Sequence, residues 1–387
     1  SCHYFLDLNM MNILFPFVGD SIGGSHWSAI NLYKELAKRS GTNPIIILHI
    51  ANGPLSDFLN NNKIPYEIIK NKSLAGSTPN IFSIIFSMIS NLFLIQSFIK
   101  NNNINIVHGN DLRINLTWSF ATLFTNSKYV WHQRQVLSKS IKWHAIRYIS
   151  DYIISISNYV HNSLPININS NSKSCISNPF NVSNLNKKQN SRRKINSLYM
   201  VSNSSFLIGY VGRIVPCKHI DDILYALSNI ITLDSVKDVH LLIIGSGDSN
   251  YIKKLNSIIK IKNLENHVTM TGFVDNPSIA LSSLDLLVAS SYNEPFGRVL
   301  VESMLQKTLV LAQKSGGHIE IISNSVNGFL YTNTSADSIS NIIMKIISNK
   351  FDNEKVIDTA YNLAIKNYSV SSHANQIIPI YNSLIRQ

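Results

Sequence analysis

Cysteine is scarce in this sequence, and the few cysteines have no useful spacing. Cys2, Cys175 and Cys217 are odd in number and far apart, which excludes a disulfide framework and a structural zinc site. A reducing cytosol is therefore the expected compartment. Charged residues are also few, at 14% of the 387 residues, whereas the hydrophobic fraction of 45% is ordinary for a globular protein. A chain of this length can form two domains, each with its own core.

Acidic residues are the minority among the charges. There are 22 Asp and Glu against 34 Lys and Arg, a formal net charge of +12. Such an excess favours nucleic acid, an anionic membrane surface or an anionic small ligand as partner. The basic residues cluster only locally, around 187–194 and 128–147, and there is no zinc finger, RNA-binding signature or basic stripe with regular aromatic residues. We therefore expect no nucleic-acid partner.

Long apolar runs are limited to residues 81–99, close to the roughly 20 residues that span a bilayer. The polar residues of this segment recur at helical spacings, which predicts an amphipathic helix; they are Ser83, Ser87, Ser90, Asn91 and Ser97. The favoured interpretation is a helix packed on the N-terminal sheet, and the alternative is a helix whose apolar face enters a lipid interface. No membrane span is expected because a strand follows closely. No cleavable signal is expected because the N-terminus lacks a basic region.

Strand-like and helix-like segments alternate in both halves of the chain, the pattern of doubly wound α/β domains. The strands expected in the first half are 11–17, 44–50, 104–108, 128–132 and 152–156, with a tight loop at 19–24 and a helix at 25–39. Residues 167–205 are rich in Asn, Ser and Lys and lose periodicity, which predicts a linker. A second domain is expected to begin with a strand at 206–211, and 371–385 to form a final helix.

Two glutamates eight positions apart, Glu294 and Glu302, form the most informative pattern. Glu294 lies in a Ser/Asn/Pro/Gly loop after an apolar run, and Glu302 lies about one turn into the helix predicted to follow. Their backbones are therefore on the order of 10 Å apart, which does not suit an acid–base pair but suits an elongated ligand held at two points. The helix start between them offers free N–H groups to a phosphate. The competing interpretation is a loop-capping Glu and a surface Glu.

The run from Ser290 to Glu302 resembles the E-x7-E signature of retaining glycosyltransferases with the GT-B fold. This is family 4, which includes sucrose synthase and bacterial lipopolysaccharide sugar transferases. Other segments match it in order, namely Gly209–Arg213 with Lys218, Leu241–Gly247, Thr271–Val274, and Gly316–Gly317 with Glu320. The resemblance is specific over 206–332 and weaker over 12–160. It implies two Rossmann-like doubly wound domains facing a cleft: an acceptor domain at 1–185, with a final helix at 371–387 packed on it, and a nucleotide-sugar domain at 186–370.

The resemblance gives four charged residues of the second half a role. Arg213 and Lys218 correspond to the family's two cations on the donor diphosphate, which suits a bidentate guanidinium and a point charge. Glu294 is expected to contact sugar hydroxyls and Glu302 to accept the ribose hydroxyls. His219 departs from the family, which usually has Gly there. Either this loop tilts differently, or His219 itself contacts phosphate.

Several glycines and backbone segments are expected to border the donor. Gly23 and Gly24 follow the first strand, where absent side chains let N–H groups approach a phosphate, although ordinary tight turns use this pair too. Asn250 breaks the Gly-x-Gly-x-x-Gly fingerprint that begins at Gly245, which argues against a nicotinamide enzyme. The resemblance instead places this loop at the nucleobase and the 296–298 backbone at the sugar and phosphate. The implied residues are Gly245, Gly247, Phe273, Val274, Phe296, Gly297 and Arg298.

Two strand-end clusters of the first half contain histidine. His132 lies where related enzymes have a catalytically important His, so the resemblance implies that it touches the donor sugar near the reacting carbon. Arg134 would hold donor or acceptor oxygens. His108 and Asn110 belong to a similar cluster and are assigned to the acceptor or sugar. Because the chain has 12 histidines, a structural role is the alternative for both.

No metal or other cofactor is expected, because the Asp-x-Asp signature of metal-dependent transferases is absent. A helix start, Arg213 and Lys218 can neutralise a diphosphate instead. The sequence thus predicts a retaining glycosyltransferase that uses a nucleoside-diphosphate sugar, with UDP favoured over GDP. The expected acceptor is a lipid-linked glycan of cell-surface polysaccharide or lipopolysaccharide synthesis, and the expected location is peripheral, on the inner face of the cytoplasmic membrane. The alternatives are a soluble-acceptor transferase and a binding or scaffold protein without turnover.

Overall fold

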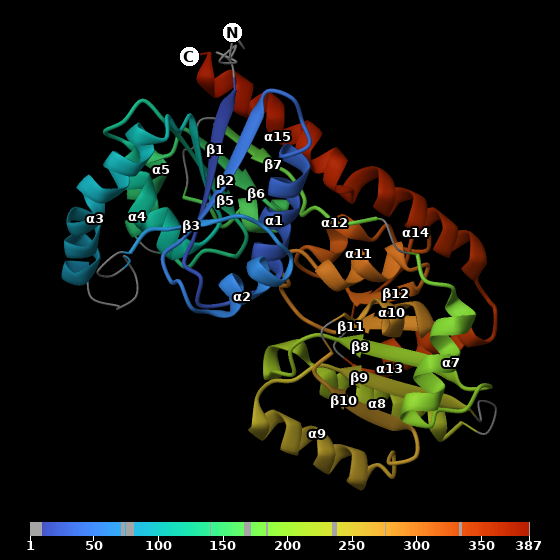
Figure 1. The fold of residues 1–387 in the computed structure, drawn as a ribbon. Helices are drawn as coiled ribbons and strands as arrows, with labels where there is room; N and C mark the ends of the chain where they lie inside the picture. The colour runs from blue at the N-terminus through green and yellow to red at the C-terminus, as the bar shows by residue number, and fades with distance from the viewer. Residues whose placement is uncertain are drawn as a thin grey trace. The chain divides into compact units, whose positions relative to one another are not determined.

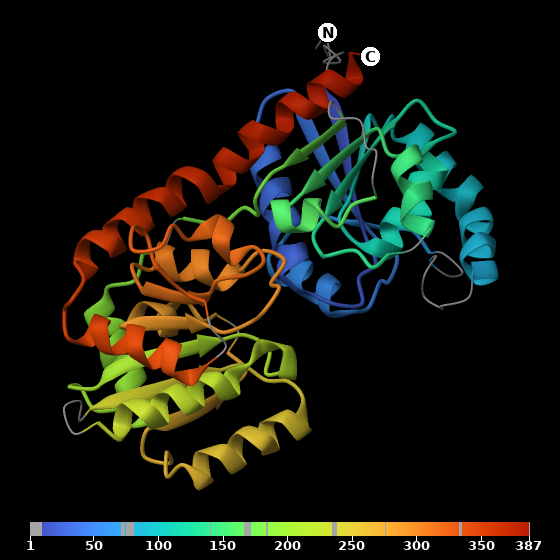
Figure 2. The same cartoon turned by 180° about the vertical axis from the view of Figure 1, so that it is seen from behind.

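The computed structural model describes most of the chain, in stretches separated by short gaps. The described residues are 10–70, 74, 81–139, 141–165, 172–182, 185–233, 238–274, 276–332 and 335–386. The chain divides into two units, Ser1–Pro179 with Val370–Gln387, and Phe180–Ser369. Each unit is a parallel sheet flanked by helices, so the predicted α/β class is confirmed (Figures 1 and 2).

The first unit is built on a seven-stranded sheet of order β3-β2-β1-β4-β5-β6-β7, with parallel neighbours throughout. The strand order reverses between β1 and β4, the place where open α/β sheets usually hold a ligand. The predicted strands of this unit lie within two residues of the observed bounds. The strands are β1 Met11–Phe17, β2 Thr42–Leu48, β3 Glu67–Ile68, β4 Ile106–Gly109, β5 Lys128–Gln133, β6 Tyr152–Ser155 and β7 Lys173–Cys175.

Separate cores cover the two faces of this sheet. Ile13 and Phe15 enter a core shared with α1, α2 and α15, whereas Leu14 enters a core shared with α3, α4 and α5 (Figure 1). This alternation follows from the period-2 geometry of a strand, and the unbroken apolar run of β1 is typical of a parallel strand buried on both faces. The helices are α1 Gly24–Leu36, α2 Pro54–Asn61, α3 Ile81–Asn101, α4 Leu112–Thr122, α5 Ile141–Ile149, α6 Asn158–His161 and α15 Val370–Ile385.

Helix α3 is a helix as predicted, but its faces differ from the prediction. It packs on α4, with Ile95 and Ile99 in the core. Ser87 and Asn91, which were placed on the polar face, are buried on this inner side, where Asn91 Nδ2 donates to the Ser87 carbonyl at 2.7 Å. Large apolar side chains cover the outer side instead, namely Phe82, Ile85, Phe86, Ile89, Phe93 and Leu94. Within the described ranges, no helix has the length and apolar character to cross a membrane.

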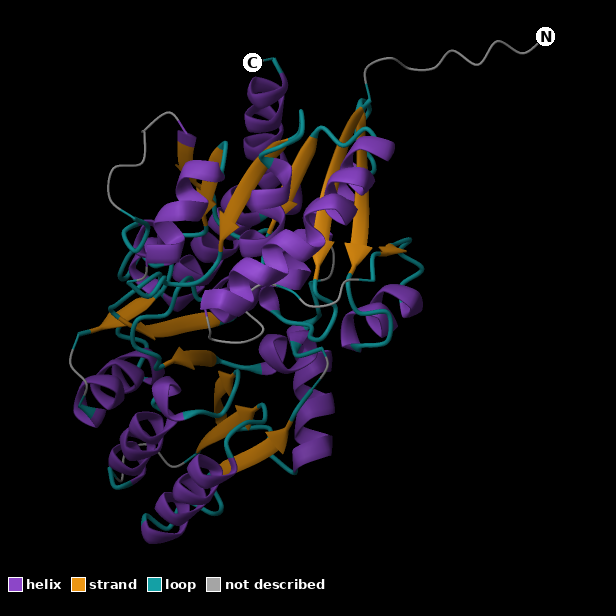
Figure 3. Ribbon diagram, turned by 90° about the vertical axis from the view of Figure 1, so that its left-hand side faces the viewer, coloured by secondary structure: helices purple, strands orange, loops and turns teal. Residues whose placement is uncertain are grey.

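The second unit has a six-stranded parallel sheet of order β10-β9-β8-β11-β12-β13, which reverses between β8 and β11. Helices flank the strands in both units (Figure 3). The strand predicted at 206–211 has the observed bounds. The strands are β8 Phe206–Val211, β9 Val239–Ile244, β10 Val268–Gly272, β11 Leu286–Ala289, β12 Leu309–Gln313 and β13 Phe329–Tyr331. The helices are α7 Lys188–Tyr199, the 3-10 turn η2 Pro216–Lys218, α8 Ile220–Ile231, α9 Ser249–Ile261, α10 Ser278–Ser283, α11 Arg298–Leu305, α12 His318–Ile321, α13 Ala336–Ile347 and α14 Asn353–Tyr368.

The linker predicted over 167–205 is wrong in part, because this stretch contains β7 and the helix α7. Helix α7 is so polar that it shows little apolar periodicity. It is held by Arg192, which donates to Asp285 Oδ2 at 3.0 Å and to the Ser283 carbonyl at 2.8 Å, and by the buried Ile195. A polar helix anchored by one arginine leaves no sequence pattern to recognise.

Candidate functional site

The loops after β8 and β11 bring three predicted site residues to one edge of the second sheet. These strands are direct neighbours, so their carboxyl ends meet at the reversal of the strand order. Arg213 and Lys218 follow β8, and Glu294 follows β11. The loops are joined by the Ser290 hydroxyl, which donates to the Lys218 carbonyl at 2.7 Å. The side chain of Arg213 is exposed, and among the described residues it forms no ion pair.

Lys218 and Glu294 form an ion pair in this loop cluster. Lys218 Nζ lies 2.5 Å from Glu294 Oε2, and the two side chains are only 19% and 23% exposed. Burial raises the pKa of Glu294, but the charge and hydrogen bond of Lys218, with a hydrogen bond from Ser291, outweigh burial and hold the pKa below its usual value. Glu294 is therefore an ionised hydrogen-bond acceptor at neutral pH.

His219 has the left-handed backbone conformation that explains why a glycine is usual here. Its φ is 50° and its ψ is 45°, a region that few L-residues adopt but that His tolerates better than most. The imidazole packs edge-on against Tyr292, with ring centroids 4.2 Å apart.

The Gly316–Gly317 turn supports the Glu294 loop from the side. The N–H of Gly317 donates to the Glu294 carbonyl at 2.7 Å, and a Cβ on Gly316 would lie 2.5 Å from the same oxygen. Only glycines permit this close approach. The next residue, His318, is buried and feels the charge of Glu294, and burial lowers its pKa. Sequence reasoning did not identify His318, because the contact depends on the fold of the turn.

Helix α11 begins directly after the Glu294 loop. Gly297, at φ 105°, is its N-cap and provides no side-chain cap, so the first N–H groups of the helix are available to an anion. Arg298 Nη2 lies 3.2 Å from Glu302 Oε1, and its guanidinium stacks over Phe180 at 4.3 Å. The adjacent Phe296 is buried. Both predicted glutamates thus have a cationic neighbour within hydrogen-bonding distance.

The loops after β9 and β10 complete this edge of the sheet. Gly245 and Gly247 lie against the Arg213 loop, where added Cβ atoms would lie 1.9 Å from the Gly212 carbonyl and 2.1 Å from the Ile214 carbonyl. Their lack of side chains is therefore required by packing. The aromatic ring of Phe273 is 71% exposed beside these loops, and Val274 is half-buried.

The first unit brings a second set of predicted residues together after β1, β4 and β5. Gly23 is the N-cap of α1 and donates its N–H to His26 Nδ1 at 3.1 Å. A Cβ on Gly23 would meet nothing within 4 Å, so the fold does not require glycine there. Gly24 is the first residue of α1. The loop is fixed by Asp20, whose oxygens accept from Arg113 at 2.7 and 2.9 Å.

His108 and His132 contact each other in the interior of the first unit. His108 Nε2 lies 3.0 Å from His132 Nδ1, and both rings are fully buried. Burial, followed by the charge of Arg134, holds the pKa of both rings well below the usual range. Tyr381 and His373 of α15 contact these rings, and sequence reasoning missed them because they lie more than 200 positions away.

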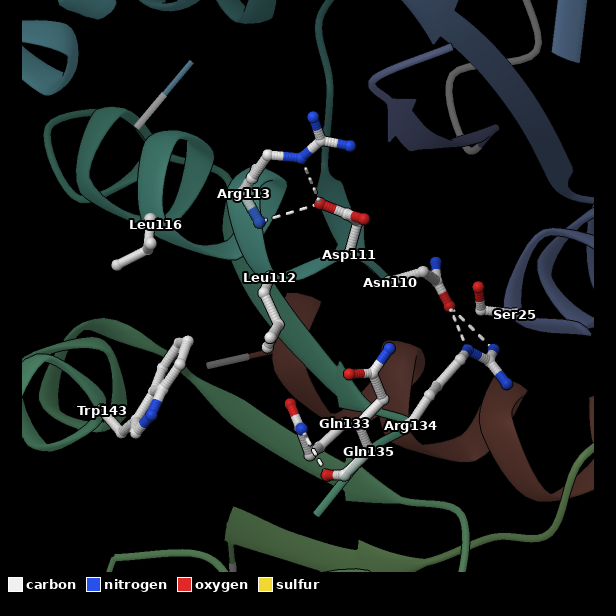
Figure 4. A pocket seen from close by; sticks show the side chains of 10 residues that line it. All are labelled: Ser25, Asn110, Asp111, Leu112, Arg113, Leu116, Gln133, Arg134, Gln135 and Trp143. Atoms are coloured by element: carbon white, nitrogen blue, oxygen red, sulfur yellow. Dashed lines mark hydrogen bonds and ion pairs between the residues drawn. The ribbon is translucent and has the colours of Figure 1, made fainter. Parts of the chain in front are cut away.

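A pocket of about 310 Å³ lies beside this cluster (Figure 4). Arg134 enters it, with Nε and Nη2 donating to Asn110 Oδ1 at 3.0 and 2.7 Å. Trp143 forms an aromatic wall. The lining residues come from α1, β4, α4, β5 and α5; they are Ser25, Asn110, Asp111, Leu112, Arg113, Leu116, Gln133, Arg134, Gln135 and Trp143. A polar pocket with one aromatic wall suits a hydroxyl-rich ligand.

Comparison with known families concerns mainly the second unit. Residues 195–363 match the family described as glycosyl transferases group 1. The second unit contains a glycosyl transferases group 1 domain. This domain includes five of the predicted charged residues, namely Arg213, Lys218, Glu294, Arg298 and Glu302.

Two relatives of this domain come from Staphylococcus aureus. The poly(ribitol-phosphate) alpha-N-acetylglucosaminyltransferase is 25% identical over 178 residues, 46% of this chain and 35% of that protein. The capsular polysaccharide biosynthesis glycosyltransferase CapM is 24% identical over 186 residues, 48% of each protein. The chain spans about half the length of the curated relatives it matches, or less.

The structural likeness extends over nearly the whole chain. The crystal structure of Anabaena HepE in complex with UDP and glucose superimposes with a TM-score of 0.80 and 22% identity, covering 96% of this chain and 100% of that one. Because the match includes both parallel sheets, the predicted GT-B fold is confirmed.

Proposed function

We propose that this chain is a retaining glycosyltransferase of family 4 that uses a nucleoside-diphosphate sugar, with UDP favoured over GDP. The observation that carries the proposal is the Lys218–Glu294 pair beside Arg213, at the strand-order reversal of a group 1 domain. In this proposal, the cations that bind the diphosphate lie next to an ionised carboxylate that binds the sugar hydroxyls. The UDP and glucose in the HepE structure support the preference for UDP.

The residues divide the work of transfer among them. Arg213, Lys218 and the N–H groups at the start of α11 stabilise the negative charge that grows on the leaving diphosphate, which needs no metal ion. Glu294 accepts hydrogen bonds from sugar hydroxyls, and Glu302 accepts them from the ribose. The bond from the anomeric carbon to the diphosphate breaks while the acceptor oxygen bonds to that carbon on the same face. A phosphate oxygen takes the acceptor proton.

The proposed acceptor is a lipid-linked glycan of cell-surface polysaccharide synthesis, reached from the inner face of the cytoplasmic membrane. One S. aureus relative is a poly(ribitol-phosphate) transferase and the other a transferase of capsular polysaccharide biosynthesis, and both support a surface polymer. The outer side of α3 supports a lipid surface, because Phe82 and Phe93 are 77% and 79% exposed. A peripheral helix of this kind binds lipid through an apolar face that lies in the interface plane.

The charge around α3 favours an anionic bilayer. Between residues 68 and 150 the only acidic residue is Asp111, and the basic residues are Lys70, Lys72, Lys100, Arg113, Lys128, Arg134, Lys139, Lys142 and Arg147. Arg113 is paired with Asp20, Lys128 is paired with Asp151, and Arg134 is buried. Each remaining cation that comes near an anionic membrane contributes about 1 kcal/mol.

A thermal-shift panel of UDP-, GDP-, ADP- and CMP-sugars tests the proposal. A ligand that binds only the folded state raises the melting temperature. We expect a shift with UDP-sugars that is lost in Arg213→Ala and Glu302→Ala. Arg193→Ala and Glu265→Ala, which change exposed residues of the second unit outside the site, are the matched controls and should keep the shift.

The other outcomes separate the alternatives. A shift with a GDP-sugar alone would reassign the nucleotide. No shift with any nucleotide sugar in a folded sample would favour a binding or scaffold protein without turnover. Transfer to a water-soluble acceptor, with no binding to anionic vesicles, would favour the soluble-acceptor transferase.

A further inference from the structure

A chain of hydrogen bonds runs from the final helix to His132. The Tyr381 hydroxyl contacts His108 Nδ1, and His108 Nε2 lies 3.0 Å from His132 Nδ1. All three side chains are fully buried. The other ring nitrogen of His132, Nε2, is also buried and has no hydrogen-bond partner among the described residues. The chain therefore ends on an unsatisfied polar atom, which is uncommon in a protein interior.

Arg134 determines the direction of these hydrogen bonds. Its Nη2 lies 3.3 Å from His132 Nδ1, and a guanidinium nitrogen can only donate. His132 Nδ1 must therefore carry the lone pair, and His108 Nε2 must donate to it. Because a neutral imidazole has one N–H, His108 Nδ1 is then an acceptor, and the Tyr381 hydroxyl donates to it. The reverse direction would place an N–H of His132 against Arg134.

We propose that Tyr381 and His108 are positioning residues that fix His132 as the neutral tautomer with its proton on Nε2. His132 is then a hydrogen-bond donor and not a base. The donor assignment follows from the contacts alone. The identity of what it binds rests on the proposed function: an oxygen of the transferred sugar or of its phosphate satisfies the buried N–H, and the acceptor's proton goes elsewhere.

Packing on both sides holds the His132 ring in this orientation. The ring of His373 stacks on it with centroids 5.9 Å apart at 16°, and His108 lies 5.2 Å away on another side. His373 Nδ1 contacts the Ser177 carbonyl at 2.7 Å, which fixes that ring as well. The titratable or charged groups that face His132 are Arg134 just after the end of its own strand, His108 on β4 and His373 on α15, and Tyr381 on α15 faces His108. None of them is a carboxylate, so nothing in this set favours a charged imidazole.

Nitrogen NMR of the histidine rings tests the assignment directly. Protein labelled with 15N-histidine gives correlations that distinguish the two neutral tautomers and the imidazolium. His132→Gln and His108→Gln each remove one of the 12 histidine patterns and so assign it. We expect the Nε2–H tautomer for both rings, with no imidazolium between about pH 8 and pH 6. A pattern with the proton on Nδ1, or an imidazolium in that range, would overturn the proposal.

We call the hydrogen bonds from Tyr381 through His108 to His132 the relay. Variants of its residues distinguish a role in setting the tautomers from a role in packing alone. His108→Gln keeps an amide donor near the position of Nε2, and we expect His132 to keep its tautomer. His108→Leu removes one donor to His132 Nδ1 and Arg134→Met removes the other, so we expect the Nδ1–H form of His132 to appear when the two changes are combined. Tyr381→Phe removes the donor to His108 Nδ1, and we expect a mixture of His108 tautomers. Tyr33→Phe, which changes another buried tyrosine of the same core, is the control. Unchanged patterns in both the double variant and Tyr381→Phe would refute the relay.

This measurement is independent of the nucleotide-sugar panel. A failed panel with the expected tautomers would reject the proposed function and leave the relay in place. A thermal shift with UDP-sugars, found together with the Nδ1–H tautomer of His132, would support the proposed function and reject the relay. Should His108→Leu fail to fold, Tyr381→Phe still decides the matter, because Phe differs from Tyr only by the hydroxyl.

Discussion

Lys218 Nζ lies 2.5 Å from Glu294 Oε2, so the cation proposed for the diphosphate is paired with the carboxylate proposed for the sugar. Both side chains are largely buried, and removal of one leaves the charge of the other without its partner. The pair therefore couples two subsites that would otherwise act separately. A bound diphosphate competes with Glu294 for Lys218, and a bound sugar then satisfies Glu294.

This coupling predicts opposite effects for the two partners. Glu294→Gln should lower sugar transfer by about 100-fold, as loss of a transition-state hydrogen bond does, yet bind free UDP at least as tightly as the wild type, since Lys218 loses its competitor. Lys218→Met should weaken UDP binding by about tenfold or more. Calorimetric titration with UDP compares the two. A UDP affinity that falls equally in both variants would contradict the competition.

Two glycines that look alike in sequence should respond differently to alanine. Gly245→Ala places a Cβ 1.9 Å from a backbone oxygen at a φ of 145°, and we expect a loss of more than about 2 kcal/mol of stability. Gly23→Ala meets nothing within 4 Å in extended backbone, so its stability should change by less than about 1 kcal/mol. The nucleotide-sugar shift should nevertheless be lost in Gly23→Ala. Denaturant titration and the thermal-shift panel check both parts. A stable Gly23→Ala protein with an intact shift would remove Gly23 from the donor site.

The outer side of α3 should determine membrane binding. Changing Phe86 and Phe93 to Asp removes two apolar side chains, each worth about 1.5–3 kcal/mol when fully buried, so binding to vesicles rich in phosphatidylglycerol should fall by at least about 100-fold. Ile261→Asp, on α9 of the second unit, changes a residue that is 76% exposed and is the matched control. Flotation with vesicles measures the binding. If the double variant still floats and instead loses a dimer seen by light scattering, the face is a contact between copies of the chain.

The buried histidines of the first unit should make that unit acid-sensitive. Burial lowers the pKa of His108 and His132, and that of His373 to about 3, so they stay neutral in the folded state while the unfolded chain takes up protons below about pH 6.5. Stability should therefore be constant above that pH and fall below it, by up to about 1.4 kcal/mol per pH unit for each histidine. The lowered pKa values of His26 and His161 act in the same direction.

Tryptophan fluorescence reports this transition selectively, because all four tryptophans, Trp27, Trp118, Trp131 and Trp143, belong to the first unit. Asp20, whose pKa is lowered chiefly by its hydrogen bond from Arg113, loses its contribution only at lower pH and does not confuse the range between about pH 6.5 and 5. In His373→Gln, the stability of the first unit should fall less steeply with decreasing pH, by the contribution of one histidine. A slope that is the same with and without His373 would show that this ring is protonated in the folded state.

Much of the fold could be predicted from local pattern. The strands β1 and β8 are apolar runs bounded by polar residues, and a parallel strand buried on both faces requires such a run. The sequence also predicts where the charged residues of the second unit lie relative to the strands. Each of them, Arg213, Lys218, Glu294 and Glu302, belongs to a loop or helix start whose position is fixed by the adjoining strand. Those predictions use information within about 20 residues, the range over which a βα unit is specified.

The rest depends on contacts between distant segments. Helix α7 has no stripe of apolar residues. It is held by the polar contacts of Arg192, which an apolar periodicity does not reveal. Ser87 and Asn91 are buried although Ser90 and Ser97 are exposed, so the polar residues of α3 do not share one face as expected. Tyr381 and His373 reach His108 and His132 only because α15 shares a core with β1. The residue pattern within one segment does not predict contacts with segments far away in the sequence.

Because α15 belongs to the first unit, that unit can be completed only after the second unit has been translated. Its residues, Val370–Ile385, are translated after all of Phe180–Ser369, so the first unit waits for its last helix while the whole second unit is made. During that interval the apolar face of β1 that α15 will cover is open on the ribosome, and His108 lacks its contact with Tyr381. A chain released early, at Ser369, keeps every charge of the second unit and yet lacks Tyr381 and His373, which contact His108 and His132. Translation of α15 is thus the step that completes the interior of the first unit.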